Sequence, residues 1–215
     1  MKSKRIVCAA LALILICSLT FAGCGKKAAV EDLVVTYVTS PLNVPSIVEK
    51  NHSIFAETMK EAGVETVTYS EITSGADQTQ ALASGDIQFL YAVGATSVLL
   101  SAANDADIKI ISMYSRSPKA FCLFSNDSSI TSPEDLRGKT VAGPQGTILH
   151  ELLVAYLAQG GMTLDDVSFI NTTIPDAMAA MLGGSVDCAL LAGAAAYNTQ
   201  ASGAHLVTDG EGLVE

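Results

Sequence analysis

Residues 77–95, DQTQALASGDIQFLYAVGA, and residues 176–194, DAMAAMLGGSVDCALLAGA, match without a gap at a constant offset of 99 positions. Each stretch reads as a helix, a glycine stop (Gly85 or Gly184), a buried strand and a Gly-Ala turn into the next helix. Any two helix–strand units share Ala, Gly and Val, but a match through two elements and both glycines favours a duplicated unit. The sequence therefore predicts two similar α/β lobes rather than one continuous sheet.

Strand-like and helix-like segments also alternate along the rest of the chain. Expected strands cover residues 33–38, 64–72, 87–93, 108–114, 119–124, 140–142, 167–171 and 186–191. Expected helices cover residues 52–62, 77–84, 96–103, 148–157, 176–182 and 194–200, and Ser132-Pro133-Glu134-Asp135 is a further helix start with a capping Ser. Near-continuous apolar strands between helices imply parallel sheets that are covered on both faces, so the predicted fold class is α/β.

Composition limits the class of partner. The chain has 215 residues, of which 49% are hydrophobic, and this is enough to bury a core. Its formal net charge is −10, from 12 basic and 22 acidic residues. Because such a surface repels phosphate backbones, a nucleic-acid partner is not expected.

The first residues read as an export signal. A basic start with Lys2, Lys4 and Arg5 is followed by the apolar run Ile6–Cys17 and by small residues directly before Cys24. This layout looks like a bacterial lipobox, in which Cys24 is acylated and anchors the mature protein in a lipid bilayer. A simple transmembrane anchor is the alternative, but the apolar run is short for a span. We therefore expect a signal peptide over 1–23, a tether over 24–31 and a lipid-anchored body on the outer face of the cytoplasmic membrane.

Two cysteines remain in the predicted body, Cys122 and Cys188, each inside an apolar strand-like run. Export permits a disulfide between them, but two buried, unpaired side chains are the preferred interpretation. Neither cysteine has a His or a second Cys at metal-binding spacing, so no metal is expected.

Two such lobes bring the loops at the carboxyl ends of their strands face to face. These loops cover residues 39–44, 72–76, 93–97, 143–147 and 192–195, and they are rich in Gly, Ser, Thr, Asn and Gln. Each loop opens a helix, whose first N–H groups are unpaired and lie at the positive end of the helix dipole. A small anion or polar ligand between the lobes would suit such loops, although each loop taken singly also reads as an ordinary helix cap.

At the level of motifs the sequence resembles a known family. Gly85-Asp86-Ile87-Gln88 runs into Val93-Gly94-Ala95-Thr96, and the more specific stretch is Ser132–Ala142, SPEDLRGKTVA. The match continues through Gln145–Thr147, Leu164–Val167 and the residues around Gly184. Together with the lipobox, these motifs resemble the substrate-binding proteins of nitrate, sulfonate and taurine ABC transporters.

The resemblance implies a type 2 periplasmic-binding-protein fold that holds a small solute between two lobes and delivers it to an ABC permease in the membrane. Relatives with the same pattern take up thiamine precursors, riboflavin or aromatic acids, so the motif does not fix the ligand. A monomer without cofactors is expected. The residues that would line the two walls are Ser40, Asn43, Thr73, Ser74, Gly75, Gly94, Ala95 and Thr96 on one side, and Gln145, Gly146, Thr147, Gly193 and Ala194 on the other.

One departure from the family concerns its usual closing stretch, which crosses back and completes the first lobe. The sequence given stops at Glu215, just after the apolar residues 206–208. The expectation is therefore a C-terminally truncated protein with an incomplete first lobe over 32–115, which exposes apolar surface, and a second lobe with the hinge crossover over 116–215.

Enzyme signatures fail in this sequence. Gly138-Lys139-Thr140 resembles the end of a P-loop, but Pro133 stands where the first glycine must be. His150-Glu151 begins a zinc-protease pattern, yet Val154 replaces the second ligand. The preferred function is a solute receptor, and the alternatives are a same-fold enzyme of chorismate-dehydratase type, which the export signal disfavours, or a sensor lipoprotein. Arg116 and Lys119 either reach an acidic ligand group or sit at the hinge.

Overall fold

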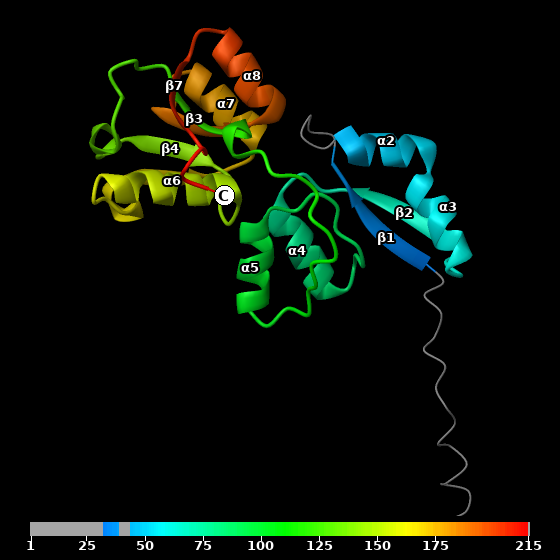
Figure 1. Ribbon diagram of the computed structural model, residues 1–215. Coiled ribbons are helices and arrows are strands. Elements are labelled where there is room, and N and C mark those ends of the chain that lie inside the picture. Colours follow the sequence, from blue (N-terminus) through cyan, green and yellow to red (C-terminus); the bar gives the residue numbers. More distant parts are fainter. Residues whose placement is uncertain (1–31, 39–43, 215) are drawn as a thin grey trace, which may run out of the picture.

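The computed structural model describes residues 32–38 and 44–214, which form two separate sheets with helices around them (Figure 1). The strands are β1 (Asp32–Tyr37), β2 (Thr66–Glu71), β3 (Phe121–Ser125), β4 (Thr140–Gly143), β5 (Ser168–Asn171), β6 (Cys188–Ala192) and β7 (His205–Asp209). The α-helices are α2 (Val44–His52), α3 (Ile54–Glu61), α4 (Gly75–Ser84), α5 (Ala95–Ala103), α6 (Ile148–Gln159), α7 (Ile174–Leu182) and α8 (Gly193–Ala201). Single 3₁₀ turns are η2 (Pro118–Ala120), η3 (Pro133–Leu136) and η4 (Leu164–Asp166). We call β1 to α5 the N-terminal half and β3 to β7 the C-terminal half.

The duplicated unit of the sequence is visible in the structure. Helices α4 and α7 begin at the same relative position, because Ser74 and Thr173 cap them by accepting hydrogen bonds from the N–H groups of Asp77 and Asp176. Gly85 and Gly184 follow the two helices with φ angles of 86° and 75°. Since this left-handed conformation suits glycine, the matching stops have a common physical cause. The predicted two-lobed α/β architecture is confirmed.

The sheet of the C-terminal half is mixed rather than parallel, with the strand order β5-β4-β6-β3-β7. Strand β4 pairs in parallel with β5 and β6, but β3 pairs antiparallel with both β6 and β7. The expectation of parallel sheets throughout is therefore wrong for β3, and β7 is a strand that the sequence did not predict. A buried apolar run shows that a strand is covered on both faces, and it carries no information about strand direction.

Two apolar cores cover the two faces of this mixed sheet. Successive residues of β6 alternate between them, so that Leu190 packs on one side and Leu191 on the other. Helix α6 covers the first face with Leu149, Leu152, Leu153, Tyr156 and Leu157, whereas α7 and α8 cover the second (Figure 1). The apolar face predicted for α6 is confirmed, and the start of η3 has the predicted capping box between Ser132 and Asp135.

The cysteines lie in different cores, Cys188 on the α6 side and Cys122 on the α7 side. Both are buried and free, as the sequence predicted. Burial raises the pKa of both thiols to about 11, so they remain protonated at neutral pH. They fill space in the core like small apolar side chains.

Polar side chains hold the N-terminal half together. Strands β1 and β2 form a parallel pair, and the buried side chain of Gln78 joins α4 to this pair. Its Oε1 accepts a hydrogen bond from Thr36 Oγ1 at 2.8 Å, and its Nε2 donates to the carbonyl of Ile72 at 3.0 Å. Because each polar atom of this buried amide has a partner, Gln78 fixes where α4 begins relative to the sheet.

The strands expected over 87–93 and 108–114 do not form. Within the first segment, Phe89 makes a single parallel bridge to Val35, and side chains replace the rest of the ladder. Gln88 Oε1 accepts from Val34 N at 2.9 Å, and Thr36 Oγ1 accepts from Tyr91 N at 2.7 Å. Residues 108–114 lie without a β partner among the described residues. A strand needs a neighbour that pairs with its backbone groups, and an apolar pattern by itself cannot supply one.

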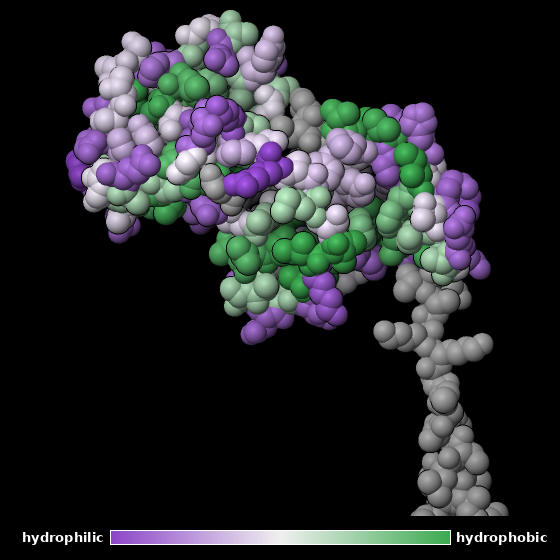
Figure 2. Space-filling view, in the orientation of Figure 1, coloured by the Kyte–Doolittle hydropathy of each residue, from purple (hydrophilic) through white to green (hydrophobic). Residues whose placement is uncertain are grey.

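Apolar side chains are exposed in and beside the N-terminal half, as the sequence led us to expect. Ile110, Ile111 and Met113 are 67%, 74% and 81% exposed, and Leu99 on α5 is 65% exposed. Figure 2 shows the hydrophobic surface that gathers over α4 and α5. In the segments that the structure describes, every helix is too short or too polar to cross a lipid bilayer.

The helix expected over 52–62 forms as α3, and a second helix, α2, which the sequence did not predict, precedes it. Ser53, with a φ of 52°, separates the two helices. The buried side chain of Glu49 explains the break. Its Oε1 accepts a hydrogen bond from the N–H of Phe55 at 2.8 Å and another from the hydroxyl of Tyr69 at 2.7 Å. A carboxylate therefore caps α3 from the preceding helix, and local sequence propensity does not reveal such a contact.

Removing the Tyr69 hydroxyl should change how stability responds to alkaline pH. Burial, followed by the hydrogen bond and charge of Glu49, raises the pKa of Tyr69 above its usual value of 10.0. The folded state thus holds this proton more tightly than the unfolded state, so the contribution is complete below pH 10 and is lost as the pH rises further. We expect urea unfolding between pH 8 and 11 to show a smaller alkaline loss of unfolding free energy for Tyr69→Phe than for the wild type. Tyr197→Phe, at an exposed position, should behave like the wild type; equal losses in all three proteins would contradict the assignment.

Candidate functional site

Three of the predicted loops meet where the N-terminal half contacts the C-terminal half. Ser97 Oγ, in the first turn of α5, donates a hydrogen bond to the carbonyl of Gly146 at 2.9 Å. A Cβ atom on Gly75, at the start of α4, would lie 3.0 Å from the same Ser97 Oγ. A Cβ atom on Gly146 would lie 3.8 Å from the side chains of Ala76 and Leu100. The beginnings of α4 and α5 therefore pack directly against the loop that precedes α6.

A second polar contact joins the halves at the same place. Thr96 Oγ1 donates a hydrogen bond to Glu151 Oε2, a carboxylate in the first turn of α6. Gly94, the residue before α5, approaches Ile148 so closely that a Cβ atom would lie 4.0 Å from its side chain. We call this contact region the seam, and it consists of Ser74–Gly75, Gly94–Ser97, Pro144–Thr147 and Glu151.

The loop from β4 to α6 is held by hydrogen bonds of its own. Asn171 Oδ1, at the end of β5, accepts from the N–H of Gln145 at 2.9 Å, and Thr147 Oγ1 donates to the carbonyl of Pro144 at 2.8 Å. Gly146 has a φ of 70°, which an L-residue with a side chain adopts only with strain. These contacts hold the backbone of the loop in one conformation at the start of α6.

Gly193 and Ala194 begin α8 at the same edge of the sheet, because β4 and β6 run in parallel. Gly193 lies in a groove of about 440 Å³ whose base contains Cys122 and Phe124. Gly146 lies at another groove, of about 310 Å³, between α4 and α5. Thus the structure brings together the predicted residues 74–75, 94–96 and 145–147. Thr73 lies just outside the seam, and Gly193 and Ala194 begin the neighbouring helix α8, with Gly193 at a separate groove.

Some predicted residues lie outside the residues that the structure describes, and for Lys119 the structure distinguishes between the two predicted roles. Ser40, Asn43 and Cys24 lie outside the described residues, as do the predicted signal peptide and tether. Lys119 forms an exposed ion pair with Glu211, with Nζ and Oε2 at 2.8 Å. This contact favours a surface role for Lys119 near the crossover over a role in ligand binding.

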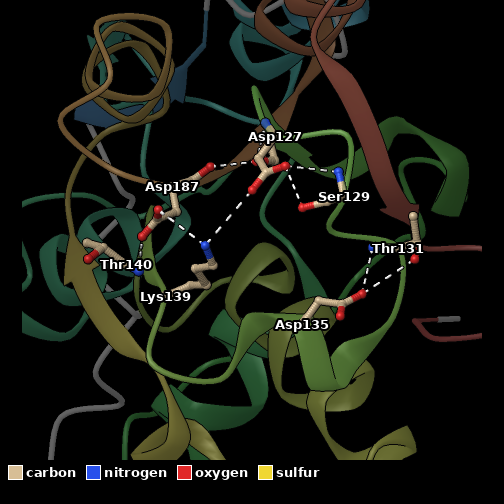
Figure 3. Close-up of polar contacts among 8 residues, drawn as sticks. Asp127, Ser129, Thr131, Asp135, Lys139, Thr140 and Asp187 are labelled. Carbon is tan, nitrogen blue, oxygen red and sulfur yellow. Dashed lines mark hydrogen bonds and ion pairs between the residues drawn. The ribbon is translucent and has the colours of Figure 1, made fainter.

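The opposite edge of the mixed sheet carries a different polar cluster, drawn in Figure 3. Asp187 Oδ2 accepts from the N–H of Thr140 at 2.7 Å, and Lys139 Nζ lies 3.9 Å from Asp187 and 4.0 Å from Asp127.

Hydrogen bonds from Ser129 lower the pKa of Asp127, and those from Thr131 and Ser132 lower the pKa of Asp135. These contacts fix the starts of β4 and η3, so this cluster is structural. Within the described residues, no group of three or more His, Cys, Asp or Glu is arranged to hold a metal ion.

Three polar residues of the site were missed as candidates: Ser97, Glu151 and Asn171. Ser97 belongs to a predicted loop, and Asn171 ends a predicted strand, so the rule that ligands bind at the carboxyl ends of strands could have found both. Glu151 gives no such signal, since its role depends on a contact with a helix 55 residues earlier in the chain.

The seam has the chemistry of a polar-ligand site. It combines the N-terminal ends of three helices, where N–H groups lack partners within the helix and the dipole is positive, with the hydroxyls of Thr96, Ser97 and Thr147. These features come from both halves of the chain. The two-lobed architecture is the one that the type 2 periplasmic-binding-protein fold predicts, with a candidate ligand site where the halves meet.

Comparison with known proteins gives the family. The profile of the NMT1/THI5-like family matches residues 51–210, and the chain belongs to this family. The taurine-binding periplasmic protein of Escherichia coli is 31% identical over 185 residues, which are 86% of this chain and 55% of that protein. The alkanesulfonate-binding protein SsuA of Xanthomonas axonopodis pv. citri, solved with MOPS, superposes with a TM-score of 0.74 at 27% identity over 86% of this chain and 62% of that one. SsuA of Escherichia coli gives 0.70 at 25% identity over 86% and 59%.

The chain thus spans about half the length of the curated relative and about three fifths of the solved ones. These relatives are named as binding proteins and not as enzymes, which agrees with the expectation that this chain is not an enzyme. The predicted family is confirmed.

Proposed function

We propose that this chain is the extracytoplasmic solute-binding component of an ABC importer, which binds a small anionic or polar solute at the seam. A sulfonate, in particular taurine or an alkanesulfonate, is the first candidate class, and nitrate and thiamine precursors are further ones. A bound solute would replace the direct contacts between the halves with contacts to itself. The two lobes would then close around the solute, so the closed form would mark the protein that has a solute bound.

One observation carries this proposal: the helix starts of both halves converge on the same seam with hydroxyl groups between them. Ser97 contacts Gly146, and Thr96 contacts Glu151, so residues of the two halves already lie within hydrogen-bonding distance. A sulfonate has three acceptor oxygens, and helix N–H groups and hydroxyls are the donors that such a group needs. The relatives named for taurine and alkanesulfonates support the choice of solute.

The remaining parts of the proposal concern where the protein acts. Residues 1–23 would serve as a lipoprotein signal peptide and residues 24–31 as a tether. Acylated Cys24 would hold a monomeric body, with lobes over 32–115 and 116–215, on the outer face of the cytoplasmic membrane beside its permease.

Titration calorimetry of the full chain against taurine, alkanesulfonates, nitrate and a thiamine precursor tests the function. We expect saturable binding of at least one sulfonate. At a ligand concentration of 100 times Kd, the gain in stability should be about 2.7 kcal/mol, because the ligand binds only the folded state. This gain corresponds to a rise in Tm of roughly 5–11 °C for a domain of this size.

Absence of binding by every one of these solutes would contradict the proposal. Consumption of chorismate, followed by mass spectrometry, would favour the enzyme interpretation instead. Saturable binding without any association with a permease, tested by co-purification from membranes, would favour a sensor.

A further inference from the structure

The carboxylate of Glu151 is an unexpected group in a site for an anionic solute. It extends from the first turn of α6 across the seam and accepts a hydrogen bond from Thr96 Oγ1, which is one of the donors predicted for the ligand. Glu151 is exposed, so a solute can reach it. Its negative charge therefore lies beside the hydroxyl and the helix ends that would hold a sulfonate.

No cation among the described residues forms an ion pair with this carboxylate. Among the ion pairs between described residues, none includes Glu151. Four described basic side chains pair with other carboxylates, and Lys50 lies over the ring of Tyr37. Since Glu151 has no ion-pair partner among the described residues, a cationic group of a bound solute could pair with it.

A bare carboxylate beside an anion site affects two kinds of solute in opposite directions. It repels a solute whose only charge is negative, because like charges a few ångströms apart disfavour each other. It attracts a solute that carries an ammonium group next to its anionic group, through a charge-assisted hydrogen bond. Both effects favour a zwitterion over a simple anion of the same shape.

We propose that Glu151 is a specificity-determining residue that selects sulfonates bearing an ammonium group over plain alkanesulfonates. When the solute enters, its ammonium group replaces the Thr96 hydroxyl as the partner of Glu151, and the released hydroxyl becomes a donor to the sulfonate. No bond forms or breaks other than hydrogen bonds and ion pairs. This inference rests on the proposed function and specifies the solute class of the same site.

The test compares two probes of nearly equal shape, 2-aminoethanesulfonate and propane-1-sulfonate, in which a methyl group replaces the ammonium. Calorimetry of the full chain should give the wild type at least about tenfold tighter binding of the amino sulfonate. In Glu151→Gln, which keeps an acceptor for Thr96, this ratio should fall to near one, mainly through weaker binding of the amino sulfonate. Glu65→Gln removes the same charge from an exposed position outside the seam and should keep the wild-type ratio.

A wild-type ratio near one, or an unchanged ratio in Glu151→Gln, would overturn the inference while leaving sulfonate binding intact. An equal loss for both probes in Glu151→Gln would also overturn it, since a purely structural role of Glu151 predicts that result. Failure of the wild type to bind either probe would also overturn the inference, and it would reject the proposed function only if nitrate and the thiamine precursor failed to bind as well.

Discussion

Replacing Thr96 with tryptophan is expected to weaken solute binding by at least about 100-fold, or about 2.7 kcal/mol. Thr96 is half-buried at the start of α5 and reaches the carboxylate of Glu151 across the seam. An indole at this position would fill the space in which we place the solute and would remove a donor. The folded body should tolerate the change, because the side chain points to the seam and not to either apolar core.

Calorimetry with a bound sulfonate and a thermal melt measure the two effects separately. Thr147→Trp, on the facing wall, should give a similar loss of affinity. Thr58→Trp places the same side chain on the exposed surface of α3 and should leave affinity unchanged. Wild-type affinity in both Thr96→Trp and Thr147→Trp would show that the seam is not the binding site.

The second large effect, on stability, is expected for the substitution Gly143→Ala. Gly143 is the last residue of β4. A Cβ atom here would lie 2.7 Å from Leu190 Cβ and 2.9 Å from its Cδ1, on the neighbouring strand β6. Because both residues are buried, the two strands must move apart. We expect a loss of roughly 3 kcal/mol of unfolding free energy, measured by urea denaturation, and a weaker solute affinity since the displaced strand leads into Pro144–Thr147.

A double-mutant cycle identifies the cause of this loss. Leu190→Gly removes the Cβ, Cγ and Cδ atoms that Gly143→Ala would meet, so the penalty of Gly143→Ala should shrink in that background. Strictly additive losses would show that the contact with Leu190 is not responsible.

Features that depend on short-range order could be predicted from the sequence. The apolar face of α6, the cap at Ser132 and the glycine stops at Gly85 and Gly184 depend on residues within a few positions of one another, and the structure has all of them. The duplicated unit also predicted the two lobes correctly. Parallel strands β4 and β6 then place the loops before α6 and α8 at one edge, so the location of the candidate site could be predicted from connectivity.

Other features depend on partners that are distant in sequence. Whether residues 87–93 and 108–114 form strands depends on a neighbouring strand that pairs with them, and the direction of β3 depends on where the chain enters the sheet. The break at Ser53 depends on Glu49 and Tyr69, which come together only when the N-terminal half is folded.

The sequence by itself determined the fold class, the family and most of the loops that line the seam. Hydrophobic periodicity, helix caps and terminal glycines depend on residues close together in the chain, so they can be recognised from the sequence alone. Only the tertiary structure decided that Thr96 and Ser97 contact Glu151 and Gly146, residues of the other half. Hydrogen bonds and charges act over a few ångströms in space, and the distance between two residues along the chain does not specify that separation.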